Sequence, residues 1–329
     1  MPSLNSDRGL TLDTIHRIEA DLPIFDATSF LADDAVGEDL ACYFETYGFN
    51  RLENRAQYSL GYVVLDNYED VKGYRVATHY WFRENAGATV FVAHGLFDHV
   101  GLYLDLIDRL LAEGYSVIAI DFPGHGLSEG EPAAIGDFAE YAHVISGVLD
   151  AFPNSLQTPI YAIGQSTGCA AILNYVLAAR GKAFQKLVLL APLIQPRSWH
   201  WVNLSYCLLN LFVSSVSRNF TVNSHREDFH EFLSRHDPLQ CRGISVDWVG
   251  AMRKWVKHFD SFGAVSIDTL VVQGDADGTV WWERNVPRIQ NKITGCQVEM
   301  IEGAMHHLVK EGDAWQSQVF SKALGFLKK

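Results

Sequence analysis

The chain has 329 residues, of which 48% are hydrophobic and 20% are charged. These values are typical of a soluble globular protein, and they exclude collagen-like, coiled-coil and wholly disordered chains. A chain of this length forms one large domain or two medium ones, and it can bury a sizeable core without disulfides or a structural metal.

The formal net charge of −13 is concentrated near the start of the chain. Residues 1–70 contain 14 acidic and four basic side chains, whereas the rest of the chain is close to neutral. We interpret this acidic N-terminal extension as a solvated covering layer. Because no basic stripe is available to neutralise phosphates, we expect no nucleic-acid partner.

Cysteine usage and the first residues indicate the compartment. The five cysteines are scattered and show no Cys-x-x-Cys spacing, which disfavours a zinc site or a disulfide framework and favours reducing conditions. The first ten residues contain no apolar stretch of signal-peptide length. We therefore expect a cytoplasmic protein.

From about residue 75, short runs rich in Val, Ile and Leu alternate with longer amphipathic segments. This alternation predicts an α/β fold with a mostly parallel central sheet and helices on both faces. Ligand sites in such sheets lie at the carboxyl ends of the strands. We expect strands at 88–93, 116–120, 159–163, 186–191, 269–272 and 297–301, and helices at 103–113, 137–152, 166–179, 281–293 and 313–327.

The alternation stops at about residue 194 and resumes at about 263, and helical segments rich in aromatic residues lie between. We predict a helical cap inserted over the carboxyl edge of the sheet. The expected parts are the N-terminal extension (1–70), the first part of the core (71–193), the cap (194–263) and the second part of the core (264–329).

Residues 198–217 of this cap contain no charged side chain, which raises the question of a membrane span. On a continuous helix, Asn203, Asn210, Ser214 and Ser217 would share one polar stripe. We therefore expect a lid helix and no membrane span, because a span between two strands of one sheet would disrupt the fold. Peripheral contact between this helix and a lipid surface remains open.

The strongest chemical signal is Gly164-Gln165-Ser166-Thr167-Gly168, placed between a predicted strand and a predicted helix. A serine exposed on such a sharp turn needs nearly side-chain-free neighbours two residues before and after it, and both are glycine here. The pattern predicts Ser166 as a nucleophile.

A nucleophilic serine needs a base and a carboxylate that orients the base. Two later strands end in loops that supply candidates in the expected order, Ser, Asp, His. The residues themselves leave Asp275 or Asp277 open as the acid, and His306 or His307 as the base.

A third strand ends in Phe-Val-Ala-His-Gly-Leu at 91–96. A loop in this position supplies one N–H group to the oxyanion, and the residue after the nucleophile supplies another, which nominates the backbone of Leu96 and Thr167. Two other patterns fail. The glycines at 124–130 do not match a dinucleotide fingerprint, and the cluster of His225, His230, Glu231 and His236 does not match a zinc motif, so we expect no cofactor and no metal.

These motifs, taken in order, resemble the α/β-hydrolase superfamily and, within it, the monoglyceride lipase and lysophospholipase family of serine aminopeptidase-like hydrolases. The resemblance implies Asp277 as the acid, His306 as the base and Leu96 as an oxyanion donor. The sequence departs from the family at Gln165 and Cys169, where His and Gly are usual. The motifs are HGLFDH at 94–99, DFPGHGLSEGE at 121–131, GQSTG at 164–168, LAPLI at 190–194, DPL at 237–239, GDADGTV at 274–280 and GAMHHLVKE at 303–311.

The expected function is a serine esterase acting on a small lipid-like ester, monoacylglycerol or lysophospholipid, through an acyl-enzyme. Leu204, Leu208 and Phe212 of the cap are expected to bind substrate by lining an acyl tunnel. The alternatives are an aminopeptidase, with Glu227, Asp228 and Glu231 holding a free amine, an acyltransferase, and a non-catalytic binding protein on the same scaffold.

Overall fold

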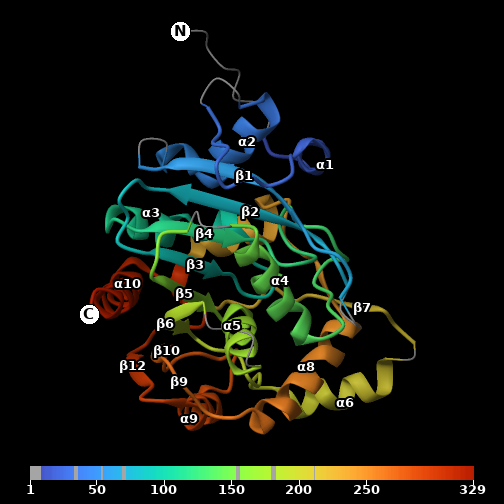
Figure 1. The fold of residues 1–329 in the computed structure, drawn as a ribbon. Coiled ribbons are helices and arrows are strands. Elements are labelled where there is room, and N and C mark those ends of the chain that lie inside the picture. The colour runs from blue at the N-terminus through green and yellow to red at the C-terminus, as the bar shows by residue number, and fades with distance from the viewer. Residues whose placement is uncertain are drawn as a thin grey trace.

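The computed structural model describes residues 9–32, 36–52, 55–68, 72–152, 156–178, 183–210 and 212–329, and in these ranges eight strands form one central sheet (Figure 1). The strand order is β1-β2-β4-β3-β5-β6-β10-β12. All neighbouring pairs from β4 to β12 are parallel, whereas β2 is antiparallel to both of its neighbours. The predicted fold class is confirmed. The strands are β1 Gln57–Val64, β2 Arg75–Phe82, β3 Thr89–Ala93, β4 Ser116–Ile120, β5 Ile160–Gln165, β6 Phe184–Leu190, β10 Asp268–Gly274 and β12 Gln297–Ile301.

Helices cover both faces of the sheet and enclose two hydrophobic clusters. Alternate residues of one strand point to opposite faces, so Val90 and Val92 pack in one cluster and Phe91 and Ala93 in the other. Burial on both faces explains why these strands are continuous apolar runs. One face is covered by α3 Leu104–Ala112 and α10 Asp313–Leu327, and the other by α4 Phe138–Asp150, α5 Thr167–Leu177, α8 Val246–His258 and α9 Trp282–Lys292.

The N-terminal segment is more than a solvated layer, and that interpretation is wrong for its two helices, α1 Leu12–Asp21 and α2 Glu38–Tyr47. Four of their six acidic residues are exposed, but Ile15, Ile18 and Tyr43 are buried in the core. The segment also contains β1, which pairs with β2 along eight residues, so the sheet begins earlier than the alternating pattern indicates.

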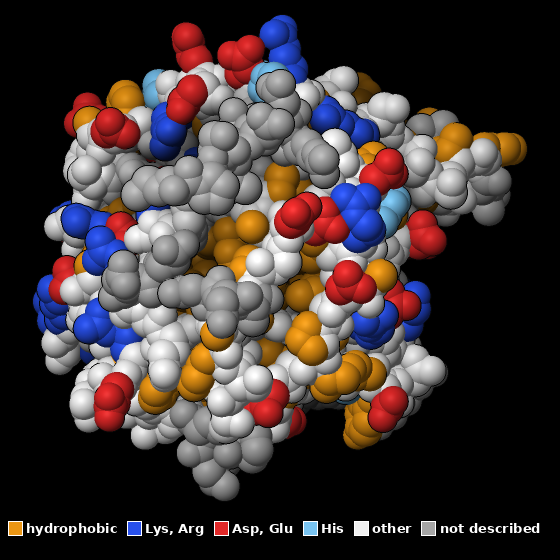
Figure 2. Space-filling view, turned by 90° about the horizontal axis from the view of Figure 1, so that it is seen from above, with side chains coloured by type: hydrophobic (Ala, Val, Ile, Leu, Met, Phe, Trp, Pro, Cys, Tyr) orange, Lys and Arg blue, Asp and Glu red, His pale blue; other side chains and the backbone are white. Residues whose placement is uncertain are grey.

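Figure 2 looks onto this end and shows apolar side chains in a hollow, which corresponds to a groove of about 1110 Å³ lined by Phe30, Phe44, Phe49, Tyr58 and Trp81, among others.

The cap between β6 and β10 is only partly helical. The expected lid helix is shorter than predicted, since α6 spans only Trp199–Leu209. Ser214 and Ser217 lie beyond its end, so they do not form a polar stripe with Asn203 on one helix. The Ser-Val-Ser run of β7 pairs with β8 in a short antiparallel ribbon. Among the described residues, no helix is both long and apolar enough to cross a membrane. The remaining elements are β7 Ser215–Ser217, α7 Glu227–Glu231, β8 Gly243–Ser245, β9 Val265–Ser266, β11 Ile293–Thr294, the π-helix Phe232–His236 and the 3-10 turns Phe49–Leu52, Val100–Tyr103, Phe259–Ser261 and Leu308–Lys310.

Candidate active site

Ser166 stands at the turn between β5 and α5 in a strained backbone conformation, with φ 53° and ψ −111°. The two glycines of the motif make this turn sterically feasible. A Cβ on Gly164 would lie 2.7 Å from Cys169 N, and one on Gly168 would overlap the carbonyl of Ala93 in β3. At this turn the backbone comes close to itself and to the neighbouring strand β3, which explains why both positions are glycine.

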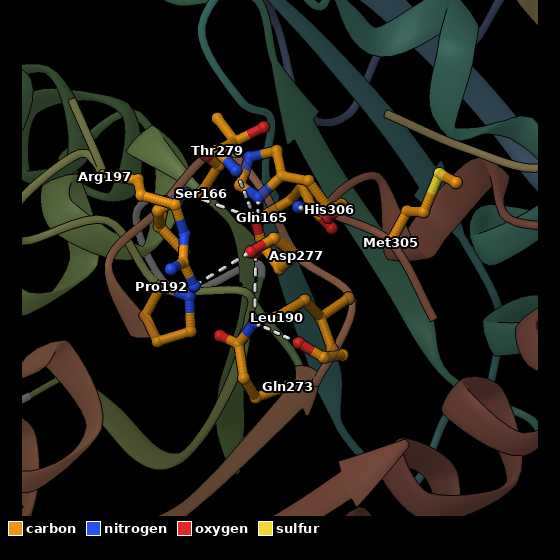
Figure 3. Close-up of polar contacts among 12 residues, drawn as sticks. Gln165, Ser166, Leu190, Pro192, Arg197, Gln273, Asp277, Thr279, Met305 and His306 are labelled. Atoms are coloured by element: carbon orange, nitrogen blue, oxygen red, sulfur yellow. Dashed lines mark hydrogen bonds and ion pairs between the residues drawn. The ribbon is translucent and has the colours of Figure 1, made fainter. Parts of the chain in front are cut away.

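Three side chains from different loops form one hydrogen-bonded row at the carboxyl edge of the sheet (Figure 3). Ser166 Oγ lies 3.0 Å from His306 Nε2, and His306 Nδ1 lies 2.8 Å from Asp277 Oδ2. A carboxylate only accepts hydrogen bonds, so Nδ1 carries the proton and donates it to Asp277. Nε2 is then free to accept the serine hydroxyl.

Asp277 is buried and held by four donors. Its Oδ1 accepts the N–H groups of Thr279 (2.7 Å) and Val280 (3.1 Å), and its Oδ2 accepts Gln273 Nε2 (3.0 Å) as well as His306. Burial alone would raise the pKa of Asp277, but the charge of His306 and these hydrogen bonds outweigh it and hold the pKa below its usual value. The carboxylate is therefore ionised at neutral pH.

The other two candidates lie elsewhere. Asp275 Oδ1 accepts the N–H of Gly303 at 2.7 Å and so links two loops without touching His306. His307 Nε2 lies 3.2 Å from Asp98 Oδ1, in a buried pair on the loop after β3. The geometry thus brings Asp277 and His306, and not Asp275 or His307, to Ser166.

The loop after β3 comes close to the serine. A Cβ on Gly95 would lie 3.5 Å from the Cβ of Ser166, so the next residue, Leu96, is beside the nucleophile. Gly95 N donates to Tyr103 Oη (3.0 Å), and Tyr103 Oη donates to Asp98 Oδ2 (2.9 Å). Thr167, which carries the other nominated N–H group, is the first residue of α5, where free backbone donors favour negative charge.

The cap residues expected to line an acyl tunnel face solvent. Leu204, Leu208 and Phe212 are 48%, 62% and 80% exposed. None of them lines the groove at the N-terminal segment or the groove beside α7. In this conformation they form an apolar surface on α6 and the residues that follow it.

Glu227 and Glu231, two of the three acidic residues of α7, line the groove beside this helix together with Met305. Met305 directly precedes His306, but its side chain points away from Ser166 (Figure 3). Asp228 pairs with Arg226 and Glu231 with Arg235. Among the described residues, no three His, Cys, Asp or Glu side chains are grouped as a metal site would need.

Two supporting residues were missed from the sequence. Gln273, at the end of β10, fixes Asp277, and its place directly before the acidic loop was the available signal. Glu311 is fully buried, and its Oε1 accepts Met305 N (2.6 Å) and lies 2.9 Å from His225 Nδ1, so it joins the loop of His306 to the cap. It lies within the quoted motif at 303–311, but spacing alone does not reveal which backbone groups a carboxylate accepts.

The order of the sheet, the serine at a strand-to-helix turn and the Asp and His loops at the same edge define an α/β-hydrolase. More narrowly, the chain belongs to the family described as serine aminopeptidase, S33, which matches residues 84–313.

Individual relatives agree with this placement. Human monoglyceride lipase is 27% identical over 280 residues, covering 81% of this chain and 91% of the relative. Mouse monoglyceride lipase is 28% identical over 271 residues, covering 78% and 88%. In structure, the chain is similar to a soluble variant of monoglyceride lipase from Saccharomyces cerevisiae, at 16% identity and a TM-score of 0.69, covering 80% of this chain and 93% of the other. The predicted resemblance to α/β-hydrolases of the monoglyceride lipase type is confirmed.

Proposed function

We propose that this protein is a serine hydrolase that cleaves carboxylic esters of lipid-like substrates, monoacylglycerol or lysophospholipid, through an acyl-enzyme. The observation that carries the proposal is the row Ser166–His306–Asp277, with contacts of 3.0 and 2.8 Å. Similarity to monoglyceride lipases along most of the chain supports the lipid-like substrate.

In the proposed reaction, Ser166 Oγ attacks the acyl carbon while His306 Nε2 takes the hydroxyl proton. Asp277 stabilises the imidazolium that forms, and the N–H groups of Leu96 and Thr167 bind the oxyanion. His306 then returns the proton to the leaving alcohol. A water molecule, deprotonated by His306, releases the acid from Ser166. These residues supply the nucleophile, the base and the oxyanion site themselves.

We further propose that the apolar surface of the cap meets lipid. Trp201 is 72% exposed, and it continues the surface formed by Leu204, Leu208 and Phe212. An exposed apolar surface of this kind supports peripheral contact with a lipid layer, from which an acyl chain could pass these residues on its way to Ser166. Their role in substrate binding is part of this proposal.

The aminopeptidase alternative has weaker support despite the family description. A free amine would need an unpaired carboxylate over the serine, whereas Asp228 and Glu231 are engaged with arginines. Glu227 lies with Glu231 in the groove bordered by Met305, whose side chain points away from Ser166 (Figure 3). Within the part of the chain that the structure describes, no comparable observation favours an acyltransferase or a non-catalytic binder.

The test is labelling of the purified protein by a fluorophosphonate, with Ser166→Ala as the matched control, followed by a substrate panel. We expect labelling of the parent alone, and hydrolysis of monoacylglycerol or lysophospholipid but not of aminoacyl anilides. Removal of the nucleophile should cost on the order of 10⁶ in kcat. Equal labelling of both proteins would refute the nucleophile, and a preference for aminoacyl substrates would replace the esterase by an aminopeptidase. Acyl transfer to an added alcohol in place of hydrolysis would indicate an acyltransferase.

A further inference from the structure

Tyr47 of the N-terminal segment contacts the loop after β3, which borders the candidate active site. This tyrosine is the last residue of α2, which lies outside the range 84–313 that matches the family. Its ring is buried between the loop after β3 and the cap. The segment is thus in direct contact with the loop that carries Leu96.

The hydroxyl of Tyr47 belongs to a buried polar network. It donates to Asp237 Oδ1 at 2.7 Å, and Asp237 is the cap residue that follows the π-helix. Asp237 Oδ2 accepts His99 Nε2 (3.0 Å) and Gln240 Nε2 (2.9 Å). His99 lies three residues after Leu96. One carboxylate therefore joins α2, the cap and the loop after β3.

Packing around the ring reinforces this connection. The rings of Tyr47 and His99 meet edge to face with centroids 4.8 Å apart. Gly101, in the 3-10 turn that continues the same loop, has no room for a side chain, because a Cβ there would lie 2.6 Å from Cγ of Tyr47. The loop backbone and the aromatic ring are therefore fitted to each other.

Charge makes the network sensitive to loss of a donor. Burial would raise the pKa of Asp237, but the charge and hydrogen bond of His99, and then the hydrogen bond of Tyr47, lower it. Burial would lower the pKa of His99, but Asp237 raises it. Asp237 is therefore a buried carboxylate, and its hydrogen bonds, the one from His99 included, offset the cost of burying its charge. Without the Tyr47 hydroxyl, Oδ1 would keep only the N–H of Leu239.

We propose that Tyr47 is a positioning residue of the active site, which holds the loop carrying the Leu96 N–H group in register with the cap through Asp237 and His99. The inference rests on the proposed esterase function for its catalytic consequence. It gives the N-terminal segment a part in the reaction.

The variant Tyr47→Phe tests this with the ring retained. An oxyanion donor acts mainly in the transition state, and losing one outright costs 10²–10³ in kcat, so loosening its loop should lower kcat by about tenfold. We expect this loss for p-nitrophenyl acetate, which is too short to depend on the cap, with KM within about twofold of the parent.

Tyr43→Phe is the matched control, because Tyr43 lies one turn earlier on α2 and its buried hydroxyl has no hydrogen-bond partner among the described residues. It should retain the parent kcat. A kcat for Tyr47→Phe within twofold of the parent, or an equal loss in Tyr43→Phe, would overturn the inference.

Amide hydrogen exchange of the peptide spanning 95–101 separates this inference from the proposed function, because it needs no catalysis. We expect faster exchange in Tyr47→Phe than in the parent and in Tyr43→Phe. If the parent hydrolyses no ester, the proposed function fails, and exchange alone decides: faster exchange in Tyr47→Phe supports the positioning role, whereas equal exchange in all three proteins refutes it.

Discussion

Replacing Asp277 by asparagine should disable the reaction through the tautomer of His306. The two oxygens of Asp277 face different donors. Oδ1 accepts two backbone N–H groups, from Thr279 and Val280, and these cannot become acceptors. Oδ2 faces the side chains of His306 and Gln273, and both of these can present an acceptor, His306 by changing tautomer and Gln273 by turning its amide so that Oε1 replaces Nε2. In the Asp277→Asn variant the amide oxygen should therefore stay at the Oδ1 position, and the NH₂ group should replace Oδ2.

An NH₂ group at the Oδ2 position is a donor 2.8 Å from His306 Nδ1. Nδ1 must then become the acceptor, and the ring proton moves to Nε2, which faces Ser166 at 3.0 Å. A protonated Nε2 cannot take the proton of the serine hydroxyl. The cost of this wrong tautomer is about 10⁴ in kcat, which corresponds to about 5.5 kcal/mol of activation free energy.

The assay is kcat for p-nitrophenyl butyrate at pH 7.5, with folding checked by circular dichroism. Asp275→Asn is the control, because its Oδ1 accepts only the N–H of Gly303, which an amide oxygen can also accept. We expect this control to retain kcat within about threefold, since surface substitutions that keep their hydrogen bond change little. Equal losses in the two variants, or a greater loss in Asp275→Asn, would refute the tautomer argument and the choice of Asp277.

Three further predictions concern the base, the stability and the cap. His306→Ala should lower kcat by at least about 10³ more than His307→Ala, because His307 contacts Asp98 and not the serine; similar kcat values in the two variants would argue against His306 as the base. Burial lowers the pKa of His125 from 6.5 to about 4, so only the unfolded chain binds this proton between those pH values, and the free energy of unfolding falls as the pH drops. His125→Asn, whose amide can keep the bond to the Pro123 carbonyl, should remove about 2 kcal/mol of the difference between pH 7 and pH 5 in urea unfolding, and an unchanged difference would contradict this. Phe212→Asp should lower hydrolysis of long-chain monoacylglycerol in vesicles by about tenfold and leave p-nitrophenyl acetate unaffected, whereas an unchanged ratio of the two rates would argue against lipid contact.

The parallel part of the sheet could be predicted because burial on both faces leaves continuous apolar runs in the sequence. All six predicted strands occur, with ends shifted by a few residues. β1 and β2 were missed because polar residues such as Ser59, Thr78 and His79 interrupt them, and their burial depends on contacts with the N-terminal segment. The early end of α6 was missed for a related reason, since the pairing of β7 with β8 is a long-range contact that no local pattern encodes.

At the candidate site, the sequence predicted which loops meet but not which side chains face one another. Loops after parallel strands share one edge of the sheet, so Ser166 could be expected near both later loops. The choice between Asp275 and Asp277 depends on the turn that lets Thr279 and Val280 donate to one carboxylate oxygen. That turn is a backbone conformation, and neither composition nor spacing determines it.

Among the described residues, three buried histidine–aspartate pairs in this region are hydrogen-bonded: His306–Asp277, His307–Asp98 and His99–Asp237. In each pair the carboxylate accepts a hydrogen bond from one ring nitrogen and so holds the imidazole in place. The pairs differ in the group that lies next to the other ring nitrogen. Only His306 presents its free nitrogen to a serine, at 3.0 Å. The Nδ1 atoms of His99 and His307 are buried with no hydrogen-bond partner among the described residues, which leaves these two pairs to tie the loop after β3 to the cap and to the catalytic loop. A buried histidine–aspartate pair is therefore used here both for catalysis and for holding loops together, and the group beside the second ring nitrogen determines which role the pair has.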